Sequence, residues 1–172
     1  MFRKGLSLLA VVLTLSFALS AFSFASDAQE FFREGYMASM SREWDKAIEL
    51  YSKSIQLSPD NAEAYLQRAA AFEMVERLDD AIADYEKTLR LKPDYYLAME
   101  YLAKLYEAKG QYGKAVDLYS RALPLVTDSK WKSMVQWWRS QAEKKLKQNR
   151  VDGDQHPSGR FPKGRVSNSG HR

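Results

Sequence analysis

The side chains in this chain that could do chemistry are carboxylates, lysines and serines, because cysteine is absent and only two histidines are present. Both histidines, His156 and His171, lie in a C-terminal stretch rich in glycine, proline, serine and arginine, where no set of metal ligands converges. A serine nucleophile needs a neighbouring base, and no glycine-rich phosphate loop is present. Asp79 has a counterpart at Asp45, which indicates a structural role at a repeated turn. The sequence therefore predicts no enzyme activity, no cofactor and no metal site.

The charge of the chain is uneven along its length. The net charge is +4 and the isoelectric point is about 9.2, but the excess positive charge lies at the two ends. Residues 26–149 carry 19 basic and 20 acidic side chains. A nucleic-acid-binding domain presents a basic patch or stripe, so this balance predicts that the folded part does not bind nucleic acid.

Residues 1–25 are typical of a secretory signal peptide. Arg3 and Lys4 precede an apolar run over residues 6–24, and residues 23–25 form a small-x-small cleavage site. The apolar run is longer than the usual signal core of roughly 7–15 residues, so an uncleaved membrane anchor is the alternative. Either way the rest of the chain crosses a membrane. We expect an exported protein in a bacterial-type periplasm or at the extracytoplasmic face of a membrane.

Residues 149–172 are predicted to form a disordered basic tail, because they are rich in glycine, proline, serine and arginine and show no apolar periodicity. Arg160, Lys163 and Arg165 could touch anionic lipid or another polyanion, although three charges supply only a few kcal/mol at best. The alternative is a simply solvated tail. Membrane contact is therefore expected only through an uncleaved leader or this tail.

The central part of the chain has a 34-residue repeat. Tyr51 recurs as Tyr85 and Tyr119, and an alanine stands four residues before each of them. Pro59 and Pro93 stand where the helices of the first two copies must have ended. A fixed period of this size indicates stacked helix pairs that cannot bury their apolar faces alone. We predict helices over residues 27–40, 43–57, 61–75, 78–91, 95–109, 112–123 and 128–148.

This pattern resembles the tetratricopeptide repeat (TPR). The small residue of the family's first helix falls on Gly35, Ala69 and Ala103, where it lets paired helices approach closely. The resemblance implies an all-α fold, a right-handed α-solenoid of three helix-turn-helix repeats plus a C-terminal capping helix. The domain covers residues 26–148, with repeats at about 28–61, 62–95 and 96–127 and the capping helix at 128–148.

The chain departs from the family pattern at several positions. Glu34 and Arg68 stand where the family usually has an apolar residue, and the third repeat lacks its closing proline. The capping helix should bury a stripe of large side chains and leave a charged outer side. The expected stripe consists of Trp131, Met134, Val135 and Trp138.

In the TPR family the first helices of the pairs line a concave groove that holds a peptide or a helix of a partner. The carried-over groove positions are apolar and aromatic in the first half and charged in the second half, which suits an amphipathic helix or an extended segment. The alternative for these side chains is plain packing within the solenoid. The predicted groove residues are Phe32, Tyr36, Met40, Leu66, Ala70, Glu73, Met74, Leu97, Glu100 and Lys104.

Some TPR domains of co-chaperones clamp a C-terminal carboxylate with lysines and asparagines, but Phe32 and Tyr36 stand at those places here. We therefore expect a different class of protein partner. The predicted function is a non-catalytic scaffold or adaptor that binds a peptide or helix in the groove. The alternative is a self-assembling structural protein, a homo-oligomer that uses its terminal helices and Trp137, with the tail docked on an anionic surface.

Overall fold

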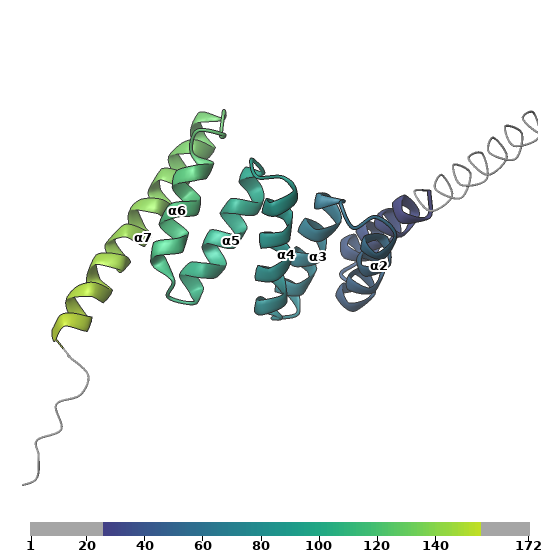
Figure 1. Ribbon diagram of the computed structural model, residues 1–172, viewed down its shortest axis with the longest axis horizontal. Coiled ribbons are helices and arrows are strands. Elements are labelled where there is room, and N and C mark those ends of the chain that lie inside the picture. Colours follow the sequence, from purple (N-terminus) through teal and green to yellow (C-terminus); the bar gives the residue numbers. More distant parts are fainter. Residues whose placement is uncertain (1–25, 156–172) are drawn as a thin grey trace, which may run out of the picture.

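The computed structural model describes residues 26–155, so residues 1–25 and 156–172 of the predicted leader and tail lie outside the described part. Within residues 26–155 the chain is all-helical, and antiparallel helix pairs stack side by side into a curved row (Figure 1). This confirms the predicted all-α solenoid. The elements are an N-terminal helix over residues 26–40, α2 (Trp44–Leu57), α3 (Ala62–Met74), α4 (Leu78–Leu91), α5 (Tyr96–Ala108), α6 (Tyr112–Ala122) and α7 (Ser129–Gln155).

The predicted helix ends agree with the structure to within one residue, except at the end of α7. That helix was expected to end at residue 148 but runs to Gln155, so residues 149–155, predicted as the start of the tail, are helical. No proline interrupts this stretch before Pro157, so the backbone can continue the helix past residue 148, although Gly153 has a low helix propensity.

The turn inside each helix pair has one repeated backbone feature. Arg42, Glu76 and Gly110 occupy equivalent positions and have φ values of 61°, 59° and 71°. A left-handed conformation suits glycine and strains residues that carry a Cβ. The sequence signals this turn clearly only in the third repeat, where glycine stands at that place.

In each repeat a small residue stands at the same position of the first helix, and in the first repeat it faces a buried tyrosine. A Cβ atom on Gly35 would lie 2.9 Å from the ring of Tyr51, which is fully buried. Ala69 and Ala103, the equivalents of Gly35, are also fully buried. The close approach of the paired helices therefore depends on these three small residues.

The repeated tyrosine also ties the two helices of a pair together by a hydrogen bond. In every repeat the phenolic oxygen reaches the residue twelve positions earlier on the first helix. Such bonds satisfy the one polar atom of an otherwise apolar ring. The pairs are Tyr51 with Ser39 at 3.2 Å, Tyr85 donating to Glu73 at 2.5 Å, and Tyr119 donating to Glu107 at 2.9 Å.

Stability should fall steeply as the pH rises above 10. Burial is the main cause that raises the pKa of Tyr85, Tyr119 and Tyr106 above 10.0, and the pKa of Tyr106 reaches about 12. The unfolded chain releases these protons near pH 10, whereas the folded protein retains them. Their contribution to the free energy of unfolding is therefore fully present below pH 10 and is lost as the pH approaches the folded pKa values. Denaturant unfolding followed by circular dichroism should give a lower free energy of unfolding at about pH 11 than at about pH 9, and equal values would contradict this.

Arg68, which stands at a usually apolar position, pairs with a buried carboxylate. Its Nε and Nη2 atoms donate to the two oxygens of Asp84 on α4 at 2.7 and 2.9 Å, and Nη1 donates to Ser52 on α2 at 2.9 Å. The guanidinium thus links α2, α3 and α4 through a bidentate ion pair. This departure from the family pattern is a polar junction between the first two repeats.

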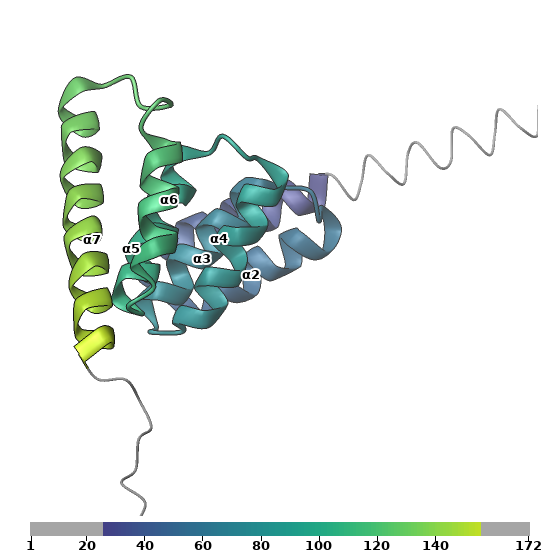
Figure 2. The ribbon, with the colours of Figure 1, turned by 60° about the vertical axis from the view of Figure 1, so that its left-hand side comes forward.

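The capping helix α7 packs beside α6 at the C-terminal end of the row (Figure 2). Val135 and Ala142 are buried, and Trp131 and Trp138 pack partly against the core. Met134, expected in the same stripe, is exposed, because the contact follows positions 131, 135, 138 and 142 along the helix. No helix within residues 26–155 has both the length and the apolar character needed to cross a membrane.

Candidate partner-binding groove

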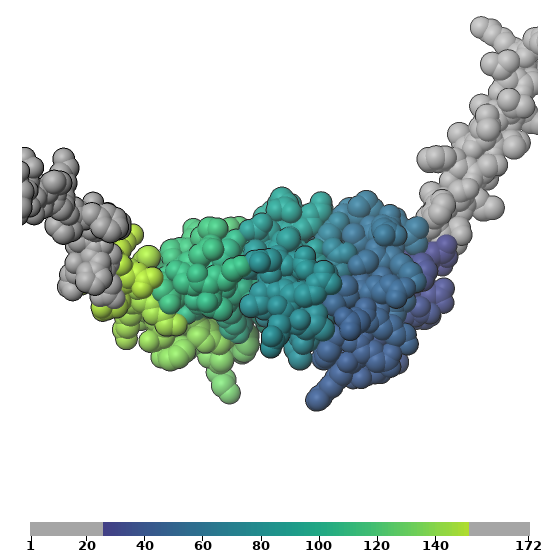
Figure 3. Space-filling model, turned by 90° about the horizontal axis from the view of Figure 1, so that it is seen from below, coloured from purple at the N-terminus to yellow at the C-terminus, as the bar shows by residue number. Residues whose placement is uncertain are grey.

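The first helices of the pairs, α3 and α5, form the walls of a pocket of about 350 Å³. We call it the groove pocket. In space-filling view the repeats form a row whose outline is hollowed between the N-terminal repeat and α7 (Figure 3). The lining residues are Glu63, Leu66, Gln67, Ala70, Glu73, Met74, Tyr85, Tyr95, Leu97 and Tyr101.

Five of the ten predicted groove residues meet in this pocket. Met74 is 57% exposed at its rim, whereas Leu66 is only 5% exposed and forms part of a wall. Ala70, Glu73 and Leu97 are partly buried between them. The spacing carried over from the family thus brings these side chains together between α3 and α5.

The predicted residues of the N-terminal helix lie outside the groove pocket. Tyr36 is 47% exposed and Met40 is 69% exposed. Phe32 is half-buried, with its ring centroid 5.7 Å from that of Tyr51. Tyr36 and Met40 therefore offer exposed apolar surface, whereas Phe32 contributes mainly to packing.

Glu100 and Lys104 lie further along α5, beside α7. Glu100 is only 1% exposed, so its carboxylate is not accessible to a partner, as that of a groove residue would be. Lys104 Nζ lies 2.6 Å from Glu100 Oε1 and 4.2 Å from the ring centroid of Trp138. The second carboxylate oxygen of Glu100 has no hydrogen-bond partner among the described residues. Lys104 thus forms an (i, i+4) ion pair within α5 and a cation–π contact with α7.

The two carboxylates of the groove pocket are held by neutral donors. Glu63 accepts hydrogen bonds from the Tyr95 hydroxyl at 2.6 Å and from the Gln67 amide at 2.8 Å. Glu73 accepts from the Tyr85 hydroxyl at 2.5 Å. Burial raises the pKa of Glu73, and the Tyr85 hydrogen bond and the charge of Lys104 oppose that rise.

Sequence reasoning missed two aromatic residues of the pocket. Tyr95 precedes α5 and reaches back to Glu63, and the exposed Tyr101 stacks on Tyr85 with ring centroids 5.7 Å apart. The family pattern places a groove residue at Glu100, whereas the next residue, Tyr101, lines the pocket. The signal available for Tyr95 was its place directly before α5, because an aromatic residue at the start of a first helix can reach the preceding repeat.

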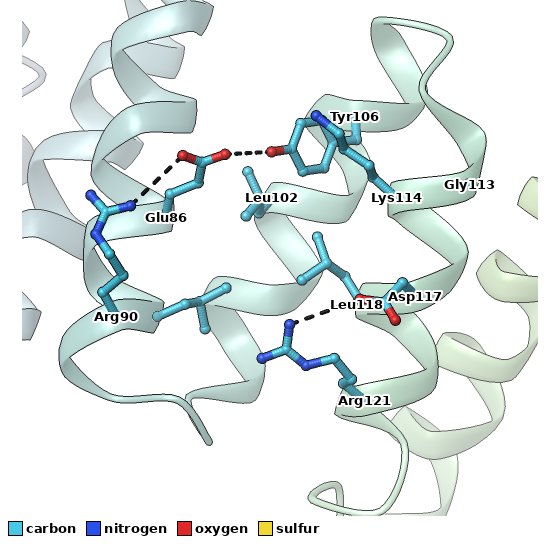
Figure 4. A pocket seen from close by; sticks show the side chains of 10 residues that line it. Glu86, Arg90, Leu102, Tyr106, Gly113, Lys114, Asp117, Leu118 and Arg121 are labelled. Carbon is cyan, nitrogen blue, oxygen red and sulfur yellow. Dashed lines mark hydrogen bonds and ion pairs between the residues drawn. The ribbon is translucent and has the colours of Figure 1, made fainter.

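A second pocket of about 570 Å³ lies between α4 and α6 and was not predicted (Figure 4). Leu102 and Leu118 line its floor, at the positions that Arg68 and Asp84 occupy one repeat earlier. Its rim carries charged residues held in long, exposed ion pairs, Glu86 with Arg90 at 3.9 Å and Asp117 with Arg121 at 3.8 Å. Lys114, whose ammonium lies 4.6 Å from the ring centroid of Tyr106, adds a third basic side chain to the two acidic ones.

Two stretches of the chain match sequence profiles of the same family. Residues 43–75 match a profile described as "TPR repeat", and residues 74–130 match one described as "Tetratricopeptide repeat". The chain contains tetratricopeptide repeats. No curated protein matches this TPR chain in sequence.

Solved structures share the fold of this TPR protein. The TPR2B-domain:pHsp70 complex of yeast Sti1 has a TM-score of 0.62 at 24% identity, covering 67% of this chain and 98% of that one. The first TPR of Spaghetti (RPAP3), bound to the HSP90 peptide SRMEEVD, has a TM-score of 0.62 at 22% identity, covering 69% and 94%. MamA has a TM-score of 0.57 at 29% identity and is covered over 59% of its length, as is this chain.

Proposed function

We propose that this TPR protein is an exported, non-catalytic adaptor that holds a peptide or helix of a protein partner in its groove. The observation that carries this proposal is the groove pocket, in which five residues chosen from the repeat pattern meet around an open space. The exposed Tyr36, Met40 and Met74 add apolar surface on the first helices. Export rests on the sequence of residues 1–25, which carries the features of a signal peptide.

The structural neighbours support the adaptor role at the level of the fold. The yeast Sti1 and Spaghetti structures are complexes of a TPR domain with Hsp70 and HSP90 peptides. TPR folds serve many pathways, so the chemistry of the partner has to be inferred from the residues of the site itself.

Replacing Tyr36 and Met74 together by aspartate should abolish capture of the partner while the protein stays folded. Both side chains are about half exposed, so the new carboxylates remain solvated, but they remove apolar contact area from the groove. The measurement is in-cell crosslinking and pull-down with the full chain, with circular dichroism to confirm the fold. Leu66→Asp is unsuitable, because Leu66 is buried and the variant would test the core instead.

The matched control replaces Met37 and Leu125 by aspartate, since both are exposed apolar residues that neither line the groove pocket nor stand at the predicted groove positions. A partner captured by the wild type and this control, but lost from the groove variant, supports the proposal. Equal capture by all three proteins would show that the partner does not bind in the groove and would contradict the proposal.

Self-association through α7 is the second candidate function. Trp137 is 61% exposed, and Met134 beside it is also exposed. Lys130, Ser133, Met134, Trp137 and Trp138 line a pocket of about 470 Å³. Capture of further copies of this chain alone, lost on Trp137→Ser, would favour this function over the adaptor.

A further inference from the structure

The groove pocket has charge of only one sign. Of its ten lining residues, Glu63 and Glu73 are acidic and none is lysine or arginine. Neither carboxylate forms an ion pair with a described residue, and their hydrogen bonds come from tyrosine hydroxyls and the Gln67 amide. A buried or half-buried carboxylate without a cationic partner favours a cation that arrives from outside.

The one cation that acts on Glu73 is already engaged. The charge of Lys104 lowers the pKa of Glu73, but its ammonium lies 2.6 Å from the carboxylate of the buried Glu100. One ammonium is therefore shared between two carboxylates, those of Glu73 and Glu100. The local negative charge remains for a ligand to neutralise.

The walls of the pocket suit the rest of a basic side chain. Tyr101 is exposed, stacks on Tyr85 and already has the Lys104 ammonium 5.7 Å from its ring centroid, so an incoming cation would share this ring with Lys104. Leu97 and Met74 line the same space and can cover the methylene groups of a lysine or arginine. An acidic peptide end would meet the two carboxylates instead, without any lysine to compensate.

The two carboxylates stand at opposite ends of the pocket. Glu63 lies in the first turn of α3 and Glu73 in its last turn, so they are separated by about 15 Å along the helix axis at a rise of 1.5 Å per residue. An extended chain covers that distance in four or five residues at about 3.3 Å each. A helix would need about ten residues to cover the same distance, at a rise of 1.5 Å per residue.

We propose that the groove pocket binds an extended segment of a partner protein with two basic residues four or five positions apart, one at Glu63 and one at Glu73. Small or apolar residues between them lie against Ala70 and Leu97. This inference rests on the proposed adaptor function and adds to it the chemistry of the partner. It also gives a physical reason for the missing carboxylate clamp, because this groove selects the opposite charge.

The test uses the full chain and fluorescein-labelled peptides in an anisotropy titration. The probe is GRALAARG, which places two arginines five positions apart, and its control carries citrulline, the neutral isostere, in place of both arginines. We expect the arginine peptide to bind at least tenfold more tightly than the citrulline peptide and the acidic peptide SRMEEVD. Equal binding of the arginine and citrulline peptides, or preferential binding of SRMEEVD, would overturn the proposal.

Glu63→Gln and Glu73→Gln remove charge and each keep one acceptor oxygen, for Tyr95 and Tyr85, whereas the bond from Gln67 to the other oxygen of Glu63 requires its amide to turn over. Each should weaken binding of the arginine peptide about fivefold to tenfold. Glu49→Gln is the matched control, since Glu49 is an exposed carboxylate on α2, and should leave binding within twofold. A loss as large in the control would overturn the assignment of the charges to the pocket.

Two further measurements do not depend on the folding of the Glu63→Gln and Glu73→Gln variants. On wild-type protein, the arginine peptide should shift the NMR signals of the Gln67 amide and the Met74 methyl group, and unchanged signals would refute binding in the pocket.

Arg160 and Arg165 in this chain's own C-terminal segment also stand five positions apart. If Arg160→Ser/Arg165→Ser raises peptide affinity tenfold, that segment is the occupant, and the assignment to a partner is wrong. Capture of a partner through the groove with no arginine preference would leave the adaptor function standing and overturn only this inference.

Discussion

Replacing Asp84 by leucine should destabilise the protein by about 3 kcal/mol, because it leaves the guanidinium of Arg68 without its carboxylate. Asp84 is buried and Arg68 is largely buried between α2, α3 and α4. Two of the three side-chain hydrogen bonds of Arg68 go to Asp84, at 2.7 and 2.9 Å, and only the bond to Ser52 would remain. A charge held in this junction without its partner is far more costly than the loss of a surface ion pair.

The double variant Arg68→Leu/Asp84→Leu should recover most or all of this loss. Leu102 and Leu118 occupy the equivalent positions of the next junction, and both are buried there, so the backbone geometry accepts this apolar pair. Replacing a buried ion pair by well-packed apolar residues is often neutral or stabilising. The ion pair is thus expected to contribute little net stability, although breaking it is costly.

Denaturant unfolding of the wild type, both single variants and the double variant completes a double-mutant cycle. Asp80→Leu is the matched control, because Asp80 lies on the same helix and pairs with Arg77 at 2.8 Å on the exposed surface. That change should alter the free energy of unfolding by less than about 1 kcal/mol. If Asp84→Leu is as mild as the control, the guanidinium of Arg68 is not confined to the junction and our account of it is wrong.

The sequence predicts the helices of this protein well because the repeat supplies three readings of one pattern. Gly110 marks the turn in the third repeat, and the period then places the same turn at Arg42 and Glu76, where the residue type alone gives no signal. The end of α7 was wrong because that helix is not part of the period. Its extension over residues 149–155 is mostly polar, so neither the repeat period nor an apolar stripe fixes its length.

The groove was predictable as a set of positions but not as a chemical environment. The period correctly brought Leu66, Glu73 and Leu97 to one pocket. It could not show that Glu100 is buried. Glu100 pairs with Lys104, and Lys104 lies over Trp138 of α7, a helix outside the repeat. It also could not give the hydrogen bond from Tyr95 to Glu63, which joins two repeats through side-chain orientation.

Replacing Ala69 by leucine should destabilise the protein by about 1–3 kcal/mol or more, because the added atoms overpack a closed helix pair. Ala69 is fully buried at the position that glycine occupies in the first repeat, where even a Cβ atom would lie 2.9 Å from the ring of Tyr51. The ring that faces this position in the second repeat belongs to Tyr85, which is itself fully buried and hydrogen-bonded to Glu73, so it has little room to move.

Ala83→Leu on α4 is the matched control for this prediction, since Ala83 is exposed and leucine is a good helix former. Thermal unfolding followed by circular dichroism should show a Tm lowered by several degrees for Ala69→Leu and nearly unchanged for Ala83→Leu. The two substitutions add the same atoms to neighbouring helices, so helix propensity cannot explain a difference between them. Equal Tm values would mean that Ala69 does not face the partner helix, and that the groove positions counted from the same repeat are misplaced with it.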